Sequence, residues 1–230
     1  MDEKNEKKKK IWKQILILII LLILLVLVII ISRKATIISS LESKLQEYQQ
    51  QNNIYSKTTF DSQVDIDMSK VKNFEIYYKD GVEKDVITSA DNNTKIIQYV
   101  YKDKVRIYSE KNGNIKFERE SDGGWSNHLI LSSATSSDNL FDLFYNSIVT
   151  SIKTENLDGT DCYVLTSKHN SSWLYDENCK EIQVYVDKET GLVKQVKNIL
   201  EVDGQEQEDI RSSEYSFGKV TDADITEPEI

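Results

Sequence analysis

The side chains best suited to chemistry in this chain include its only two cysteines, Cys162 and Cys179. Their separation is not that of a Cys-x-x-Cys redox motif. They could form a structural disulfide that closes a loop of 17 residues, or they could stay as two free, partly buried thiols. We favour the disulfide, because both cysteines follow the membrane-spanning segment described below and are expected on its oxidising side.

The two histidines, His128 and His169, are 41 residues apart, and neither lies in a cluster with the spacing of zinc ligands. Around His169, the residues Ser171, Ser172 and Asp176 could be drawn as a triad, but neighbours in one loop rarely hold that geometry. The chain has no Gly-x-Ser-x-Gly motif and no phosphate-binding Gly-rich loop. We therefore expect a non-enzymatic protein without metal or cofactor, and keep a hydrolase dependent on His169 as an alternative.

Two acidic clusters are also candidates for ion binding, Asp61 with Asp65 and Asp67, and Asp222 with Asp224. The first resembles a calcium loop only superficially, because the loop glycine and the terminal glutamate are missing. We interpret both clusters as solvated carboxylates.

The elements that must position these residues begin with an apolar run, Ile15 to Ile31, of 17 consecutive Ile, Leu and Val residues. It is apolar on every face, unlike the helix of a soluble protein. From Ile11 to Ser32 the segment is long enough, at about 33 Å, to cross a bilayer core of about 30 Å. We predict one transmembrane helix over residues 11–32.

Six lysines precede the run, and only three basic residues follow it closely. The positive-inside rule therefore predicts a cytoplasmic basic tail (residues 1–10) and an extracellular remainder, anchored in the cell membrane by a single pass. A cleaved signal peptide is the alternative, but Ile29 to Lys34 contains no small-x-small cleavage site. The first 34 residues carry a net charge of +5, so the rest must carry −14 of the total −9, which argues against nucleic acid as a partner.

A stalk helix is predicted over residues 33–53, where Ile37, Ile38, Leu41, Leu45 and Tyr48 recur at helical spacing. The stripe is too short for a coiled coil. It either packs on the following domain or lifts that domain off the bilayer.

Residues 54–230 are predicted to form one β-rich domain with antiparallel neighbouring strands, because short turn sequences separate alternating apolar segments. The predicted strands are 54–61, 71–78, 82–88, 94–101, 104–109, 114–120, 161–167, 181–187, 192–202 and 208–217. Turn residues such as Asp80-Gly81, Asn112-Gly113 and Asp203-Gly204 join them. One helix interrupts the pattern, capped by Ser136 or Ser137 and continuing at helical spacing through Ile152.

Aromatic residues are concentrated in the predicted strands, and both faces of strand 94–101 are substantially apolar. This pattern suits a sheet that is covered on one side and lines a groove on the other, although strand propensity alone would also favour tyrosine. Our groove candidates are Phe74, Tyr78, Tyr99, Tyr101, Phe144 and Tyr185. Trp125, Trp173 and Leu129 to Leu131 fall in predicted loops, where they could contact lipid or a partner.

Three segments, taken together, resemble the bacterial lipoprotein-carrier-like (LolA-like, outer-membrane lipoprotein-sorting) family. They are an opening strand at Tyr55 to Phe60, the hairpin Glu181–Val196 with its Asp187, Thr190, Gly191 and Leu192, and the acidic tail Glu214–Ile230. The resemblance implies an α+β fold, in which a strongly bent antiparallel sheet forms an incomplete barrel closed by one or two helices. It also implies an apolar concave side that holds acyl chains or docks polypeptide.

The sequence therefore predicts a membrane-tethered binding protein whose ligand is a lipid or acyl chain, a lipoprotein or an exported polypeptide. The spanning helix departs from the family and argues against shuttling between distant membranes. The alternative is a regulatory or assembly ectodomain that binds the extracellular segment of another membrane protein.

Overall fold

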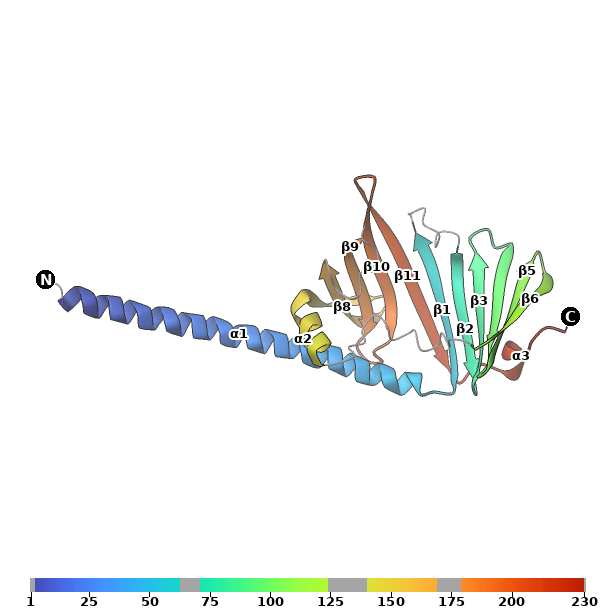
Figure 1. Cartoon of the computed structure of the whole chain (residues 1–230), viewed down its shortest axis with the longest axis horizontal. Coiled ribbons are helices and arrows are strands. Elements are labelled where there is room, and N and C mark those ends of the chain that lie inside the picture. Colours follow the sequence, from blue (N-terminus) through green and yellow to red (C-terminus); the bar gives the residue numbers. More distant parts are fainter. Residues whose placement is uncertain (1–2, 63–70, 124–139, 169–178, 230) are drawn as a thin grey trace.

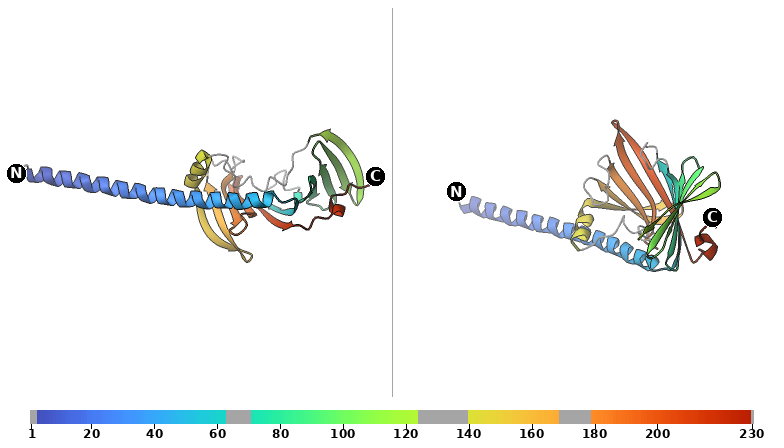
Figure 2. Two further views of the ribbon diagram at one scale, coloured as in Figure 1. Left: turned by 90° about the horizontal axis from the view of Figure 1, so that it is seen from below. Right: turned by 45° about the vertical axis from the view of Figure 1, so that its right-hand side comes forward.

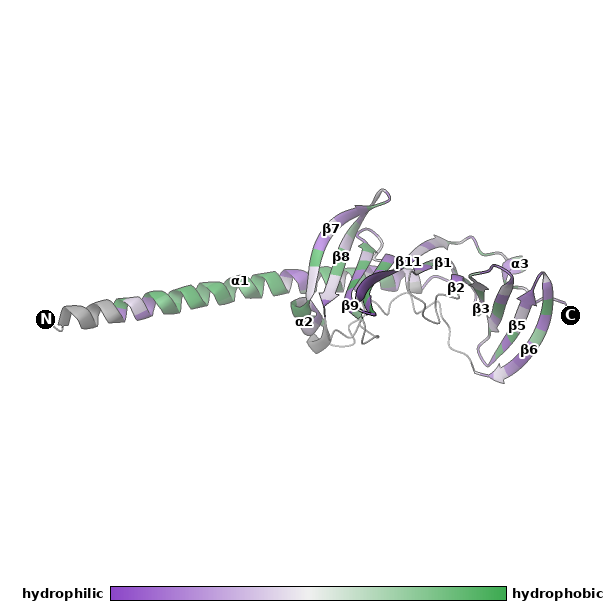
Figure 3. Ribbon diagram, turned by 90° about the horizontal axis from the view of Figure 1, so that it is seen from above, coloured by the Kyte–Doolittle hydropathy of each residue, from purple (hydrophilic) through white to green (hydrophobic). Residues whose placement is uncertain are grey.

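The computed structural model describes residues 3–62, 71–123, 140–168 and 179–229. Its longest element is the helix α1 (Glu3–Gln49), which contains the whole apolar run and continues beyond it without a break. The part of α1 within Lys10–Tyr48 is long and apolar enough to cross a membrane, and none of its most apolar window is buried in the protein. Figure 3 shows this bare apolar segment projecting from the sheet.

The later turns of α1 do the opposite and pack on the sheet. Ile38, Leu41 and Leu45 are at most 2 % exposed. Ile38 and Leu41 form one core cluster with side chains from β8, β9 and β10, namely Leu165, Ile182, Val184, Val186 and Val193. Of the two arrangements that the stripe allowed, the structure therefore has the one in which it packs on the following domain.

The strands form a single antiparallel sheet within the described residues, in the order β6-β5-β4-β3-β2-β1-β11-β10-β9-β8-β7. The first arm contains β1 (Asn53–Ser62), β2 (Val71–Lys79), β3 (Val82–Ser89), β4 (Thr94–Val100), β5 (Lys104–Lys111) and β6 (Asn114–Asp122). The second arm contains β7 (Thr150–Leu157), β8 (Thr160–Lys168), β9 (Cys179–Asp187), β10 (Val193–Val202) and β11 (Gln205–Phe217). Each arm is a meander, and β1 pairs with β11 to join them.

The sheet is bent (Figure 1). It is also open, because its terminal strands β6 and β7 lie at opposite ends of the strand order and do not pair with each other. This confirms the predicted α+β class and the incomplete barrel. Two short helices accompany it, α2 (Leu140–Val149), which lies against α1, and α3 (Asp222–Ile225), which packs on β2 and β3. Figure 2 shows α2 and α3 towards opposite ends of the sheet.

Four hairpins turn on two-residue Asx-Gly loops in which both residues have positive φ, the signature of type I′ turns. They are Asp80-Gly81, Asn112-Gly113, Asp158-Gly159 and Asp203-Gly204. Such turns match the right-handed twist of the strands, and they fix the register of the hairpins in both arms of the sheet.

We call the side of the sheet that packs on α1 the inner face and the opposite side the outer face. Side chains alternate between the two faces along each strand. The cross-strand register therefore carries the assignment from β9 through to β5. It places Ile54, Ile76 and Val100 on the inner face, and Tyr55, Tyr77 and Tyr99 on the outer face.

The predicted continuation of the interrupting helix to Ile152 is wrong. Helix α2 ends at Val149, and residues from Thr150 onward form β7, which pairs with β8 along its whole length. Thr150, Ile152 and Thr154 are β-branched and favour a strand. The spacing of Ile148 and Ile152 is helical only by coincidence. The proposed caps Ser136 and Ser137 lie outside the described residues.

Candidate functional site

The inner face of the first arm carries a row of apolar side chains that no element in the described part of the chain fully covers. The register places Phe74 opposite Ile87 and Ile87 opposite Ile96, so the row crosses β2, β3 and β4. Phe74 and Ile87 are half-buried, and Ile96 is 46 % exposed. We call these three residues the inner-face row. An exposed large apolar side chain on a face of the sheet is a point where an apolar ligand could be buried.

Next to the row, the inner face is polar and tightly packed. Glu83 and Asp85 precede Ile87 at alternate positions of β3 and are at most 2 % exposed. Buried carboxylates must be engaged with other groups, and both of these are. They form a polar border along one side of the inner-face row.

A second polar cluster lies on the inner face where β10, β11 and β1 meet. Asp209 is 1 % exposed, and its Oδ2 accepts hydrogen bonds from Asn198 Nδ2 (3.0 Å) and Arg211 Nε (3.0 Å). The Arg211 guanidinium lies 5.7 Å from the centroid of the Phe60 ring, within the range of a cation–π contact. Because the charges of Asp209 and Arg211 neutralise each other, the cluster is a structural border rather than an ion-binding site.

A groove of about 640 Å³ lies between α1 and α2, just beyond the predicted span. Its lining is formed mainly by small side chains of α1, namely Ala35, Thr36, Ser39, Ser40 and Ser43, together with Lys44 and Leu143. Lys44 Nζ donates to the carbonyl oxygen of Lys188 and fixes α1 to the β9–β10 turn. We call this feature the α1–α2 groove.

The structure divides the predicted groove residues between two faces. Phe74 and Tyr78 share the inner face, whereas Tyr99, Tyr101 and Tyr185 point to the outer face. Phe144 lies in α2, and its side chain is outside the described part of the structure. The five described side chains therefore do not share one face, and contact of the six candidates with a ligand stays a prediction.

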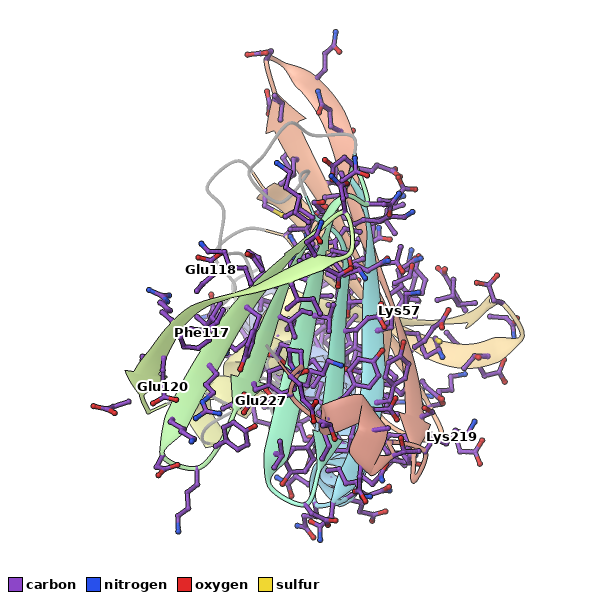
Figure 4. All side chains as sticks on the ribbon, turned by 90° about the vertical axis from the view of Figure 1, so that its right-hand side faces the viewer. Lys57, Phe117, Glu118, Glu120, Lys219 and Glu227 are labelled. Carbon is purple, nitrogen blue, oxygen red and sulfur yellow. The ribbon has the colours of Figure 1, made fainter. Side chains whose placement is uncertain are left out.

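On the outer face, the C-terminal tail crosses the first arm and is fastened at Glu227 (Figure 4). The hydroxyls of Tyr101 and Tyr108 donate to its two carboxylate oxygens. Arg106 Nη1 donates to both oxygens, at 3.1 and 3.0 Å. One residue earlier, the Tyr99 hydroxyl donates to the carbonyl oxygen of Thr226 at 2.9 Å.

These contacts change the acidity of the groups that make them. Burial raises the pKa of Tyr108 to about 12, and the hydrogen bond to Glu227 adds to the effect. Burial and the charge of Glu227 also raise the pKa of Tyr99 to about 12. Burial alone would raise the pKa of Glu227, but hydrogen bonds from Tyr101, Tyr108 and Arg106 outweigh it, so the pKa lies below its ordinary value. The phenols thus stay protonated donors and the carboxyl stays an ionised acceptor.

Sequence reasoning missed Arg106, Tyr108 and Glu227 as a unit. The signal was available in part, since alternation in two strands joined by a tight turn puts Arg106 and Tyr108 on the same face as Tyr99. The tail that would meet them could not be placed without the fold.

The predicted disulfide is wrong, because both Cys162 and Cys179 are free thiols. The two cysteines lie at opposite ends of the β8–β9 hairpin. Cys162, near the start of β8, is opposite Asp187 at the end of β9, eight residues from Cys179. At about 3.3 Å per residue that is about 26 Å, well beyond the Cα separation that a disulfide can bridge. The end of β8 that lies near Cys179 is the opposite one, where Lys168 pairs with Glu181.

Among the described residues, no group of three or more His, Cys, Asp or Glu side chains could hold a metal ion. Asp61 is exposed, and Asp222 forms an exposed salt bridge with Lys79 at 2.5 Å. The remaining residues singled out from the sequence lie outside the described ranges: Asp65, Asp67, Trp125, His128, Leu129 to Leu131, His169, Ser171, Ser172, Trp173 and Asp176.

No family model and no curated protein matches the chain. Among solved structures, it is similar to the Mycobacterium tuberculosis lipoprotein LppX, with 14 % identity, 78 % of this chain and 93 % of that chain covered, and a TM-score of 0.44. It is also similar to a putative outer membrane lipoprotein-sorting protein domain from Vibrio parahaemolyticus, with 9 % identity, 84 % and 97 % coverage and a TM-score of 0.31.

A third similar structure is the Pseudomonas aeruginosa MucA/MucB complex, with 12 % identity, 83 % of this chain and 61 % of that chain covered, and a TM-score of 0.35. A putative lipoprotein-sorting protein domain and a LolA superfamily protein are thus among the similar solved structures. At these identities and TM-scores, the likeness goes no further than the arrangement of strands and helices.

Proposed function

We propose that this chain is a membrane-tethered, non-enzymatic binding protein whose inner face holds the apolar part of a ligand. The ligand class is an acyl chain, carried by a lipid or a lipoprotein, or an apolar stretch of an exported polypeptide. The observation that carries the proposal is the inner-face row, because Ile96 is 46 % exposed on the same face that α1 fills over the second arm.

The inner-face row is short. Its three residues lie on neighbouring strands about 4.8 Å apart, so the row is about 10 Å long between its outer members. Burial of apolar surface contributes about 25 cal/mol per Å² before the costs of association are subtracted. Affinity would therefore depend on the summed contact along the row and not on one residue.

The anchor determines which membrane supplies the ligand. The lysine-rich flank predicts that the sheet lies outside the cell, and the α1 helix that enters the bilayer is the same helix that packs on the sheet. The binding domain is thus held next to its own membrane. We infer that it extracts, presents or senses a ligand there and does not carry it to a distant membrane.

The test uses the full chain purified in detergent and a fluorescent fatty acid as the probe. We expect saturable binding that weakens at least about tenfold in Ile96→Glu, a loss of about 1.4 kcal/mol. The matched control is Ile115→Glu, which places the same charge at an apolar residue that is 38 % exposed on β6. Equal affinities of the two variants, or no binding by the wild-type chain, would contradict the proposal.

A second candidate function is recognition of another membrane protein. It is favoured by Tyr145 and Ile148 of α2, which are 38 % and 50 % exposed on the helix that borders the α1–α2 groove. A photo-reactive amino acid at position 148 should then cross-link a membrane protein in intact cells, and one at the exposed position 205 should not. Cross-linking to lipid alone at position 148 would argue for the first function.

A further inference from the structure

The last residues of the chain are attached to the outer face by a one-sided set of hydrogen bonds. Seven hydrogen bonds between described residues run from side-chain donors of the sheet to acceptors in residues 222–227. The donors are Lys79, Lys84, Tyr99, Tyr101, Arg106 and Tyr108, which we call the outer-face donor site. The acceptors are two carboxylates and two backbone carbonyl oxygens.

Such a set of contacts selects more for charge and backbone shape than for sequence. The backbone makes one helical turn, α3, and becomes extended at Thr226. The carbonyl oxygens of Asp224 and Thr226 would be present in any peptide. Only the carboxylates of Asp222 and Glu227 require particular side chains. An acidic segment with two carboxylates at this spacing would satisfy the same donors.

Contacts within the sheet also hold the donors of this site in position, independently of the tail. Lys84 Nζ lies 5.4 Å from the Tyr77 ring centroid and 5.8 Å from that of Tyr99. Tyr99 in turn meets Tyr108 edge-to-face at 5.7 Å. These groups belong to neighbouring strands, so the sheet holds the donors in place before a ligand arrives, which lowers the cost of binding.

Charge complementarity favours an acidic partner. Lys79, Lys84 and Arg106 place three cations in one site, although residues 35–230 carry a net charge of −14. The tail that covers them carries Asp222, Asp224 and Glu227. Together with Glu120, which accepts from Arg106 Nε at 2.5 Å, the tail neutralises a place where this acidic domain could attract an anionic segment.

The site is larger than the tail. The tail contacts β2 at Lys79, β3 at Lys84, and β4 and β5 at the tyrosines and Arg106, in strand order. The next strand, β6, continues the outer face with Phe117, which is 44 % exposed and packs edge-to-face on Tyr108 at 5.5 Å (Figure 4). Ile115, also exposed, pairs with Glu110 on the same strand pair. A longer acidic segment would find an apolar contact beyond the end of the tail.

We propose that the outer-face donor site is a docking site for a short acidic segment of a partner protein that adopts the same backbone course as the tail, and that the C-terminal tail occupies it in the resting chain. The site lies on the face opposite the inner-face row, so this inference is independent of the proposed function. The tail acts as a competing intramolecular ligand that a partner must displace.

The receptor in the test is the chain truncated after Thr221, with its N-terminal helix kept, purified in detergent. This truncation keeps Val220, which is buried and exchanges two hydrogen bonds of 2.8 Å with the Asn53 side chain. The probe is a fluorescent peptide of residues 221–230. We expect saturable binding to the truncated chain, and binding at least about tenfold weaker to the intact chain, in which the tail competes.

Variant peptides show whether the site recognises the carboxylates or only rebinds the exact sequence of its own tail. Glu227→Gln in the peptide should weaken binding about tenfold or more, whereas Glu229→Gln should not. A peptide with alanine everywhere except Asp222, Asp224 and Glu227 should still bind. Two leucines added after Ile230 should tighten binding, and Phe117→Ser in the receptor should remove that gain.

If the truncated chain does not fold, the intact Glu227→Gln chain serves as receptor, because its own tail has lost its strongest attachment. The proposal is overturned if neither receptor binds the native peptide. It is also overturned if the Glu227→Gln peptide binds as tightly as the native one, or if the alanine-rich acidic peptide does not bind.

Discussion

Glu227 is the residue on which the attachment of the tail depends. Its carboxylate accepts from two phenols and one guanidinium, and a hydrogen bond to a charged group contributes about 1.5–3 kcal/mol. We expect Glu227→Gln to lower the free energy of unfolding by about 1–3 kcal/mol at pH 7, measured by urea denaturation. The control Glu229→Gln removes an exposed carboxylate of the same tail, and it should change stability by less than about 0.5 kcal/mol.

The pH dependence of this contribution has a definite sign. Because the pKa of Glu227 is lower in the folded protein than in the unfolded chain, its stabilisation is fully present above the unfolded value of about 4.3 and is lost as the pH falls through the folded value. The difference in stability between the wild type and Glu227→Gln should therefore shrink below about pH 4. A difference that stays constant down to lower pH would contradict the assignment.

The two cysteines should behave as chemically different free thiols. Burial raises the pKa of the Cys162 thiol and lowers its reactivity, whereas Cys179 is partly exposed at the start of β9. In the native protein, we expect a maleimide to label Cys179 and to reach Cys162 only after unfolding, as measured by mass spectrometry. An intact mass lower by the two hydrogens of a disulfide would contradict this expectation.

At the scale of elements, the strands were largely predictable because their ends carry turn chemistry. Asx-Gly pairs with positive φ separate alternating apolar segments at Gly81, Gly113 and Gly204, and each predicted strand overlaps a strand of the sheet. The strand that was not predicted is β7. Its Asp158-Gly159 turn has the same chemistry, but the apolar residues before it also fit a helix, so local pattern alone could not separate the two.

The candidate sites were less predictable than the strands, for a geometrical reason. Alternation assigned Tyr99 and Tyr101 correctly to one face of β4 and Ile96 to the other. Which face carries α1 and which carries the tail depends on contacts between residues more than 100 positions apart, such as Tyr99 with Thr226. Such contacts leave no periodic trace in the sequence. The same holds for the cysteines, whose separation depends on the register of β8 against β9.

The close approach of α1 to the turn between β9 and β10 predicts a sharp glycine effect. A Cβ at Gly191, where φ is +75°, would lie 2.5 Å from the carbonyl oxygen of Leu41. We expect Gly191→Ala to destabilise the protein by about 2–4 kcal/mol. Gly204→Ala is matched in φ but meets no atom within 4 Å, so it should cost only about 1–2 kcal/mol of backbone strain. Thermal unfolding of the two variants measures the difference, and equal losses would argue against the contact.

At the scale of the whole molecule, helix α1 joins the apolar segment to the sheet, because its later turns pack in the core of the sheet. The chain should stay with the membrane fraction after an alkaline wash, because α1 offers a span with no buried face. Protease added to intact cells should digest the sheet while sparing the span, because the lysines predict a cytoplasmic N-terminus. Release of the sheet into the medium with a new N-terminus near position 33 would contradict this topology. So would a sheet that resists external protease in intact cells but is digested after the cells are lysed.

The uninterrupted course of α1 has a mechanical consequence. A flexible linker would let an ectodomain swivel freely above its anchor, but here the helical hydrogen bonds of α1 continue from Glu3 to Gln49 and into the core formed with Ile38 and Leu41. If α1 spans the bilayer as we propose, a change in the tilt of its membrane-spanning part rotates the whole sheet with it. Thickening or thinning of the bilayer would swing the inner-face row towards or away from the lipid headgroups.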